Sequence, residues 1–353
     1  MRAELAAIWI YFADTSCRGY SPLYDDISRA VAQSDAVLAL VQEAPPEGHL
    51  PTVLLAAVHY LLLGGEDSPL AAVYAGTSNA PVGPRFVEFC LDHRAEIVEL
   101  LATRRTNTNE VGRSAVLAPA IAHATRDGSA IGLVDVGCSA GLNLYCDRYF
   151  VDYGRAGSTG PKDAAVRLSC EVVDGRPPIV PQLPAVLTRV GIDRHPVDVG
   201  NDDARRWQLA CVWPDTGRLA RTRHALDVLQ HAPPRVLAGD AVDTVGDAID
   251  LLPADALAVV ITTWMLAYLS PERRVAFRDA LADASRRRPI TWISGESAGV
   301  VDQFADASVP AHEDGIEPSV LGLVTFRDGG IDCAELLAFV HPHGSWIDWR
   351  ARA

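Results

Sequence analysis

Residues 132–149 read GLVDVGCSAGLNLYCDRY, and this stretch decides what kind of fold the chain adopts. An apolar run typical of a buried strand stops at Gly137, and after Gly141 the sequence LNLYCDRY can continue as a helix. A strand, a tight turn and a helix start place backbone N–H groups and the positive end of the helix dipole in a crevice at the strand's carboxyl end. We therefore expect a ligand to bind at the turn between these two glycines.

Strand-like and helical patterns alternate along the rest of the chain. Beyond the opening strand, β-branched runs occur at 186–193, 235–240, 256–263 and 290–296, and segments such as PERRVAFRDALADASRRR separate them. This alternation predicts βαβ crossovers and a parallel sheet, so the expected fold class is α/β. Near the end, RDGG at 327–330 separates two further strand-like runs, which predicts an antiparallel hairpin.

The N-terminal third has a helical pattern instead. Residues 1–125 carry apolar residues at three- and four-residue spacing, with Gly and Pro between the periodic segments. We expect an all-helical N-terminal domain at 1–125 and an α/β domain at 126–353. Residues 150–185 interrupt the α/β pattern, because RAGSTGPKD is typical of a loop and AVRLSCEVV alternates apolar and polar residues like a solvent-facing strand. We interpret this segment as an insertion.

Composition and charge limit the possible partners. With 45 acidic and 31 basic residues the net charge is −14, which argues against nucleic acid and favours a small molecule. The seven cysteines form no CxxC pair, which is typical of reduced thiols in a cytoplasmic protein and suggests no zinc site. Glu4 makes the N-terminus a poor signal peptide, and the longest apolar run, 50–65, is shorter than the ~20 residues that cross a bilayer. We expect no membrane association.

The residues of the glycine turn favour a ligand without phosphate groups over a dinucleotide. In a GxGxxG dinucleotide motif, the middle glycine lets the backbone approach a pyrophosphate closely. This chain has Ser139 at that position. Asp135 precedes the first glycine by two positions, and an acid there suits a pyrophosphate poorly. It could instead hold the cationic amino-acid portion of a cofactor that has no phosphates.

The pattern Asp135-x-Gly137-x-x-x-Gly141 resembles the first motif of class I S-adenosylmethionine-dependent methyltransferases. The resemblance covers residues 110–349 and implies a Rossmann-like seven-stranded sheet whose last two strands form the antiparallel hairpin. The whole chain, including TNTNEVGRSAVLAPAI and RRWQLACVWP, also resembles an uncharacterised bacterial family thought to be methyltransferase-like.

The resemblance also implies roles for residues at the other strand ends. Asp193 would hold the ribose hydroxyls of S-adenosylmethionine, and Asp240 with Ala241 would lie near the adenine amino group. Thr263 ends the fourth strand, whose exit lines the acceptor site. Asp240 could equally cap the following helix. Ser139 and Asn143 are further candidates for contact with the cofactor, with loop and capping roles as the alternative.

The ribose-binding acid has a rival in the insertion. Such acids normally follow the glycine turn by ~20 residues, and Asp193 comes much later. Asp174 ends the strand-like part of the insertion and could take the role. We favour Asp193 because LTRVGID has the flanks of an interior strand.

Further candidates lie on either side of the predicted cofactor. Arg113 belongs to a polar cluster with Asn107, Asn109 and Glu110, and could pair with the carboxylate of the cofactor's methionine part. A solvated helix start is the alternative for this cluster.

On the acceptor side, Trp264 and Tyr268 could line a pocket, and Tyr268 could position a nucleophile; core packing is the alternative. Glu296 could act as a general base if its pKa were raised, with a surface or capping role as the alternative. His341 and His343 resemble a metal-binding pair, but no further ligand at suitable spacing completes a site, so we expect no metal.

These residues predict an S-adenosylmethionine-dependent transferase that methylates a small-molecule acceptor, with Tyr268 and Glu296 as candidate catalytic residues. Because a sulfonium methyl group is already activated, the protein needs mainly to align the acceptor and exclude water. The helical domain and the 150–185 insertion would recognise the acceptor. Two alternatives are an NAD(P)-dependent oxidoreductase and a non-catalytic cofactor-binding or interaction protein.

Overall fold

The computed structural model describes residues 2–106 and 109–352. The chain forms two compact units, which we call the helical unit (Met1–Thr108 and Asp198–Arg223) and the sheet unit (Asn109–Val197 and His224–Ala353). The sequence pattern placed a boundary at residue 125, whereas the compact units divide at 108. The segment 198–223 lies far along the chain and still belongs to the helical unit.

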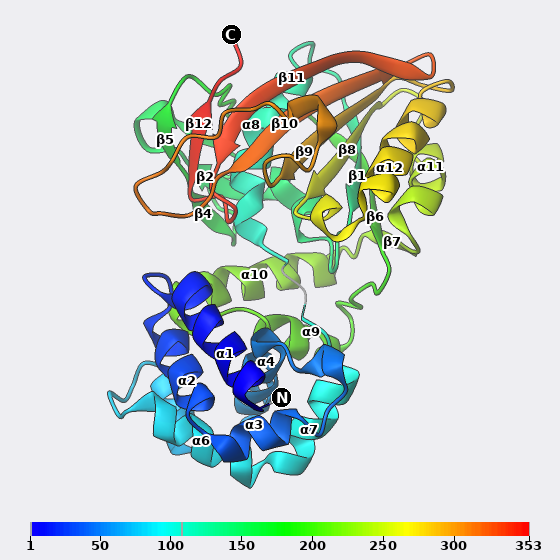
Figure 1. Cartoon of the computed structure of the whole chain (residues 1–353). Coiled ribbons are helices and arrows are strands. Elements are labelled where there is room, and N and C mark those ends of the chain that lie inside the picture. Colours follow the sequence, from blue (N-terminus) through cyan, green and yellow to red (C-terminus); the bar gives the residue numbers. More distant parts are fainter. Residues whose placement is uncertain (1, 107–108, 353) are drawn as a thin grey trace. The chain divides into compact units, whose positions relative to one another are not determined.

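The helical unit is built from α-helices (Figure 1). Serine and proline residues start several of them. Ser21, Ser34 and Ser68 each accept a hydrogen bond from the backbone three residues later, which satisfies an N–H group that has no partner inside the helix. The helices from the first part of the chain are α1 (Arg2–Phe12), α2 (Pro22–Ala32), α3 (Asp35–Val41), α4 (Pro51–Leu63), α5 (Pro69–Tyr74), α6 (Val82–Asp92) and α7 (Arg94–Thr103).

The long apolar run of the sequence forms α4, a buried helix of the helical unit. Its residues from Val53 to Tyr60 are all buried, which shows that the helix packs against other elements on every side. This packing explains why its sequence is apolar all round. No helix in the described residues combines the length and the apolar character that a membrane crossing requires.

Segment 198–223 supplies α9 (Asp202–Ala210) and the start of α10 (Arg218–His231). Trp207 and Ala210 of α9 form a buried cluster with Ala56 and Tyr60 of α4. The Trp207 indole N–H also donates to the carbonyl of Arg105 at 2.8 Å. These contacts explain why a segment from the second half of the chain belongs to the helical unit.

A nine-stranded mixed sheet forms the centre of the sheet unit, in the order β5-β12-β11-β10-β9-β8-β1-β6-β7 (Figure 1). Strands β7, β6, β1, β8 and β9 run parallel to one another. Strands β10, β11 and β12 add antiparallel pairs. The bounds are β1 (Ile131–Val136), β5 (Glu171–Asp174), β6 (Val186–Asp193), β7 (Arg235–Ala238), β8 (Leu257–Thr263), β9 (Ile290–Glu296), β10 (Ser319–Arg327), β11 (Gly330–Val340) and β12 (Trp346–Trp349).

The α/β class and the antiparallel C-terminal strands agree with the sequence, but the expectation of a Rossmann-like seven-stranded methyltransferase sheet is wrong. Two short strands extend the sheet beyond the hairpin. The chain turns back after β11 to form β12, and β5 from the 150–185 segment pairs with β12 in parallel. The sequence predicted a strand in the 150–185 segment that ends at Asp174, where β5 lies. Its pairing with β12, and β12 itself, were not predicted, because a strand of four residues gives a weak periodic signal.

The rest of the 150–185 segment forms a small second sheet. Strands β2 (Phe150–Asp152), β3 (Ser158–Thr159) and β4 (Arg167–Ser169) pair in the order β3-β2-β4. The segment therefore contributes to both sheets of the unit.

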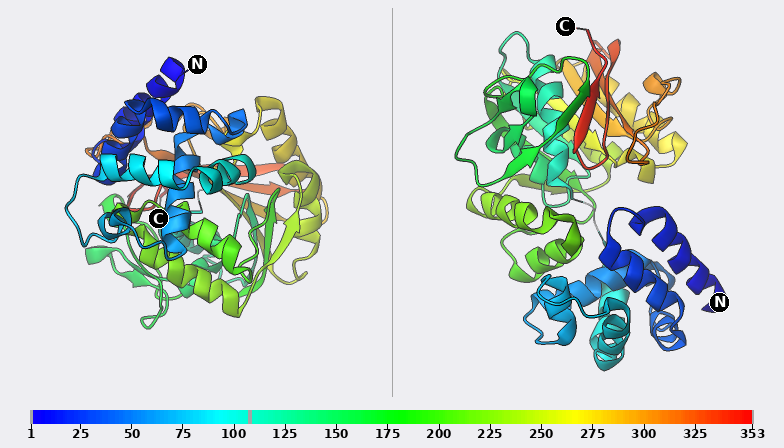
Figure 2. Two further views of the ribbon diagram at one scale, coloured as in Figure 1. Left: turned by 90° about the horizontal axis from the view of Figure 1, so that it is seen from below. Right: turned by 90° about the vertical axis from the view of Figure 1, so that its left-hand side faces the viewer.

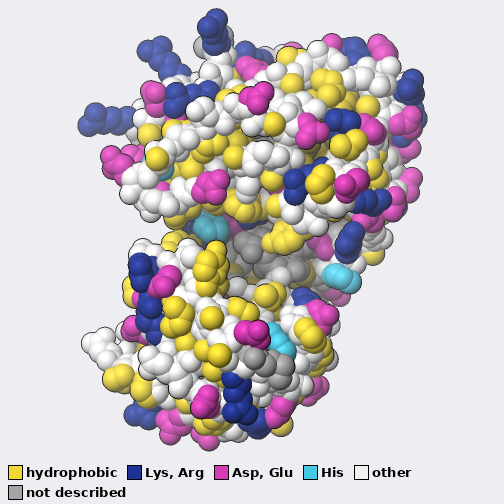
Figure 3. All heavy atoms as spheres, in the orientation of Figure 1, with side chains coloured by type: hydrophobic (Ala, Val, Ile, Leu, Met, Phe, Trp, Pro, Cys, Tyr) yellow, Lys and Arg dark blue, Asp and Glu magenta, His cyan; other side chains and the backbone are white. Residues whose placement is uncertain are grey.

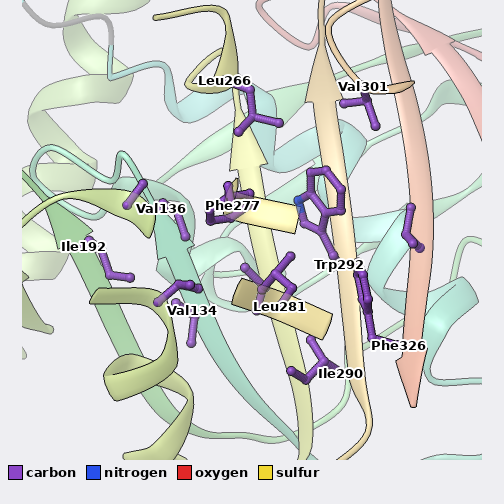
Figure 4. Close-up of a cluster of buried hydrophobic side chains, with 14 of the residues drawn as sticks. Val134, Val136, Ile192, Leu266, Phe277, Leu281, Ile290, Trp292, Val301 and Phe326 are labelled. Carbon is purple, nitrogen blue, oxygen red and sulfur yellow. The ribbon is translucent and has the colours of Figure 1, made fainter. Parts of the chain in front are cut away.

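Helices cover both faces of the large sheet (Figures 1 and 2). α8 (Ser114–Ala124) lies on one face, while α11 (Ala241–Asp250) and α12 (Pro271–Ala284) lie on the other. Burial of apolar side chains between α11, α12 and the strands stabilises this layer, and Figure 4 shows its centre. The labelled residues come from β1, β6, β9, β10, α12 and neighbouring turns: Val134, Val136, Ile192, Leu266, Phe277, Leu281, Ile290, Trp292, Val301 and Phe326.

On the face drawn in Figure 3, acidic and basic side chains are interspersed over the sheet unit. This distribution agrees with the excess of acidic residues in the sequence and shows no continuous basic stripe on that face.

Candidate functional site

The strand order of the sheet reverses at β1. Strand β6 lies on one side of β1 and β8 on the other, and the following strands continue outward from each. Ligands of open parallel sheets bind at such a reversal, beyond the carboxyl ends of the strands. The predicted turn 137–141, Asp193, Thr263 and Glu296 all follow or end strands at this edge.

The glycine turn is fixed against β6 by its own backbone. The N–H groups of Gly137 and Cys138 both donate to the carbonyl of Ile192, at 2.8 and 3.0 Å. Gly137, Ser139 and Gly141 all have positive φ, of 76°, 51° and 86°. For Ser139 this left-handed conformation is uncommon, so the chain here is held in a demanding shape.

Gly137 also makes room for the neighbouring turn after β8. A Cβ atom at this position would overlap the side chain of Met265, so the close packing of the two turns requires glycine. The turns at the ends of β1 and β8 therefore support each other at the point where the strand order reverses.

The segment after the turn differs from the expected helix. Residues Leu142–Arg148 form a 3₁₀ helix that is interrupted at Tyr145, which has non-helical dihedral angles. A short, irregular 3₁₀ segment does not build the macrodipole of a long α-helix. Arg113 supplies a buried positive charge at this edge of the sheet.

Asp135 is a buried carboxylate near the end of β1. Its exposed fraction is 2%, and its carboxylate accepts no hydrogen bond from a described residue. Burial raises its pKa to about 8, the positive charge of Arg113 opposes that rise, and Asp193 adds to it. A carboxyl group with this pKa keeps its proton at neutral pH, and a cation beside it would favour the ionised form.

Arg113 lies at the same edge and is also buried, with an exposed fraction of 7%. Its Nε donates to the carbonyl of Pro342 at 3.1 Å, and its Nη1 donates to the carbonyl of Thr263 at 3.0 Å. Burial lowers its pKa, while Glu110, Glu296, Tyr268 and Asp135 oppose that effect. Nη2 donates to no described residue, so the main chain orients the guanidinium through its other two nitrogens.

Asp193 connects β6 to the glycine turn. One of its carboxylate oxygens accepts from the N–H of Ser139 and the other from the N–H of His195, each at 2.8 Å. Its rival Asp174 ends β5, at the opposite edge of the nine-stranded sheet, and is exposed. Only Asp193 of the two belongs to the strand next to β1.

Asp240 is the N-cap of α11, which is the alternative role that the sequence left open. It accepts a hydrogen bond from the N–H of Val242 at 2.9 Å and forms ion pairs with Arg194 and Arg273. Burial raises its pKa, but these partners outweigh burial and the pKa is lowered. Ala241 follows as the first residue of the helix and is buried.

Glu296 supports the turn after β8. It is fully buried, and its Oε1 accepts from the N–H groups of Met265 and Leu266 at 3.1 and 3.2 Å. Its Oε2 is buried without a hydrogen-bond partner, and burial raises the pKa to about 7 against the opposing effects of the backbone and Arg113. The turn begins with Trp264 in a left-handed conformation, at a φ of 56°.

The remaining candidate residues are either exposed or bonded to other parts of the sheet unit. Tyr268 is 85% exposed, so it does not line an enclosed pocket. The Trp264 indole N–H donates to the hydroxyl of Ser319 at 2.8 Å. Asn143 accepts from the hydroxyl of Ser114 at 3.0 Å and so ties the segment after the glycine turn to α8. Asn107 lies outside the described residues.

Several groups that shape this edge of the sheet could not be identified from the sequence. The carbonyls of Thr263 and Pro342 orient Arg113, and Met265 packs on Gly137. Backbone carbonyls are available at every residue, so only the folded chain identifies them. Among residues 2–106 and 109–352, no three His, Cys, Asp or Glu side chains converge in the manner of a metal site.

Comparison with curated proteins gave no match to this chain. A family model, by contrast, matches residues 7–349, nearly the whole chain and both compact units. The chain therefore belongs to the bacterial family described as "uncharacterized protein conserved in bacteria", DUF2332.

Proposed function

We propose that this protein binds S-adenosylmethionine and transfers its methyl group to a small-molecule acceptor. The observation that carries the proposal is a pair of buried ionisable groups at the strand reversal, the carboxyl group of Asp135 and the guanidinium of Arg113. Asp135 has no hydrogen-bond donor among the described residues, and Arg113 has one nitrogen without a described acceptor. Asp135 precedes the glycine turn by two residues, and Arg113 binds the end of β8, the strand next to β1.

This donor set fits an amino-acid zwitterion. The Asp135 carboxylate would accept from the α-ammonium group, and Arg113 Nη2 would donate to the α-carboxylate. Two bound charges of opposite sign would offset the cost of burying both side chains. S-adenosylmethionine carries such a zwitterion and no phosphate, which agrees with Ser139 at the position of a dinucleotide motif's middle glycine.

The remaining roles follow the positions of the strand ends. Asp193 would bind the ribose hydroxyls with the lone pairs that Ser139 and His195 leave available. Asp240 and Ala241 would lie at the adenine side, while Ser139 and Asn143 would shape the turn around the cofactor. The bound cofactor supplies a methyl group that is activated by its sulfonium.

On the acceptor side, the protein needs to align the nucleophile and exclude water. Glu296 fits proton removal better than Tyr268, because it is buried with a raised pKa, whereas Tyr268 is exposed. The excess of acidic residues favours a small acceptor over a polyanion. All seven cysteines are free thiols, which supports the cytoplasm as the compartment.

Calorimetric titration with S-adenosylmethionine, S-adenosylhomocysteine and NADH in parallel tests the proposal. We expect the first two to bind and NADH to remain silent. NADH binding alone would favour an oxidoreductase, and silence from all three would favour a non-catalytic interaction protein.

The variant Asp193→Ala sharpens the same experiment. We expect it to weaken S-adenosylmethionine binding by ~1.5–3 kcal/mol, the contribution of a hydrogen bond to a charged group. Asp174→Ala is the matched control, because it removes the rival carboxylate at the far edge of the sheet. Unchanged affinity in a folded Asp193→Ala variant would remove Asp193 from the site.

A further inference from the structure

We infer that the turn at residues 341–344, HPHG, is a positioning element that sets the direction of Arg113 and thereby makes the site selective for ligands with a carboxylate. This inference rests on the proposed function, because it assigns Arg113 to the carboxylate of the bound amino-acid portion. The two histidines of the turn then have a structural task in place of metal binding.

The turn holds one side of the Arg113 guanidinium. It connects β11 to β12, and the carbonyl of Pro342 accepts from Nε at 3.1 Å. The carbonyl of Thr263, at the end of β8, accepts from Nη1 at 3.0 Å. The guanidinium is planar, so two fixed nitrogens also fix the direction of the third. Loss of either carbonyl would let Nη2 swing away from the ligand.

Gly344 brings the turn against the backbone that carries Arg113. It has a φ of 76°, and its N–H donates to the carbonyl of His341 at 2.9 Å. A Cβ atom here would overlap the carbonyl oxygen of Gly112 and lie 3.1 Å from the amide nitrogen of Arg113. Both neighbours are backbone, which cannot move aside as a flexible side chain can. Any larger residue must therefore push the turn away from Arg113.

The histidines link the turn to the same segment. His343 Nδ1 lies 3.8 Å from Oε2 of the buried Glu110, whose Oε1 accepts from the N–H of Gly112 at 2.8 Å. His341 Nδ1 accepts from the N–H of His343 at 2.9 Å, which closes the turn on itself. The 341–344 turn thus contacts the 110–113 segment at Glu110, Gly112 and Arg113.

The test compares two ligands that differ in the amino-acid portion. S-adenosylhomocysteine carries the α-carboxylate, and 5′-methylthioadenosine lacks the whole amino-acid group. We expect Gly344→Ala to weaken S-adenosylhomocysteine binding about tenfold or more, the effect of losing one charged hydrogen bond, and to leave 5′-methylthioadenosine within about twofold of wild type. Calorimetry on the full-length protein measures both affinities.

Gly128→Ala is the matched control. Gly128 also has a positive φ, of 78°, but no atom lies within 4 Å of its Cβ position, so the substitution adds backbone strain without displacing the 341–344 turn. We expect both ligands to bind this variant as they bind wild type. If Gly344→Ala does not fold, His343→Ala tests the same turn with less disruption, and we expect a selective loss of about threefold for S-adenosylhomocysteine.

The outcomes separate the inference from the function on which it rests. If wild type binds S-adenosylhomocysteine and the turn variants lose both ligands equally, or lose neither, the 341–344 turn does not position Arg113. If wild type binds neither ligand, the proposed function fails and the inference falls with it.

Discussion

Asp135 is costly to keep in the folded protein unless a ligand compensates its charge. The side chain is buried, and burial raises its pKa to about 8 even though Arg113 opposes the rise. A cationic group bound beside it would favour the ionised form and recover part of that cost. The ionised side chain thus lowers the stability of the free protein, and a bound cation would offset that effect.

The pH dependence of unfolding follows from this shift. An unfolded chain ionises Asp135 near the ordinary pKa of an aspartate, whereas the folded chain keeps the proton until about pH 8. Between these values the folded state binds more protons, so this group makes the protein less stable as pH rises. We expect Asp135→Asn to remove that slope and to exceed wild type in unfolding free energy by about 1–3 kcal/mol at pH 8. Urea unfolding at pH 5 and pH 8 measures it.

The same variant should bind S-adenosylmethionine much more weakly, since an amide does not neutralise an ammonium group. Asp174→Asn serves as the control for both measurements, because Asp174 is exposed at the edge of the sheet. A wild-type protein and an Asp135→Asn variant with the same pH slope would contradict the assignment of that slope to Asp135.

The turn between β1 and the following 3₁₀ segment depends on glycine for two separate reasons at Gly137. The residue has a positive φ, and its Cβ position is occupied by Met265 from the turn after β8. The positive φ is a local requirement, whereas the contact with Met265 is a tertiary one. The two contributions to stability can be measured separately by comparison with a glycine that has a similar φ but no atoms near its Cβ position.

Gly128 provides that comparison, with a φ of 78° and no atom within 4 Å of its Cβ position. We expect Gly128→Ala to cost only the left-handed backbone penalty of ~1 kcal/mol. Gly137→Ala should cost ~2–4 kcal/mol, because it adds the overlap with Met265. Chemical denaturation of both variants measures the difference. Equal costs would mean that Met265 moves aside freely and that the two turns do not depend on each other.

The helical unit is discontinuous in sequence. Its N-terminal part, 1–108, includes α4, and the contacts of Ala56 and Tyr60 on that helix come from α9 in the segment 198–223. A chain that ends near residue 108 or 125 would lack Trp207 and its hydrogen bond to the Arg105 carbonyl. No continuous N-terminal piece therefore contains all of the contacts of the helical unit.

We expect residues 1–108 alone to unfold at a midpoint at least ~10 °C below that of the same segment joined through a Gly/Ser linker to residues 198–223, since loss of a buried Trp costs ~3–5 kcal/mol. Thermal unfolding followed by far-UV circular dichroism measures both. Equal midpoints would show that α9 adds nothing to the stability of the helical unit.

Local sequence patterns were enough to predict most of the large sheet. The strand that contains Asp135, the glycines after it, the parallel strands 186–193 to 290–296 and the C-terminal hairpin all follow from periodicity and turn residues, which act over a few neighbouring positions. The contacts show that Asp240 caps α11 and that Asp193, not Asp174, lies next to the glycine turn, and the cofactor-binding roles of these residues stay predictions.

Tertiary structure alone decided the features that depend on distant partners. The sequence indicated a strand at the position of β5 but not the partner with which it pairs, and β12 is too short to show a period. The helical segment 198–223 joins a unit whose other residues precede it by about a hundred positions. Arg113 and Asp135 were both visible in the sequence, but the main-chain carbonyls that orient one and the burial that raises the pKa of the other arise only when the folded chain excludes water from the edge of the sheet.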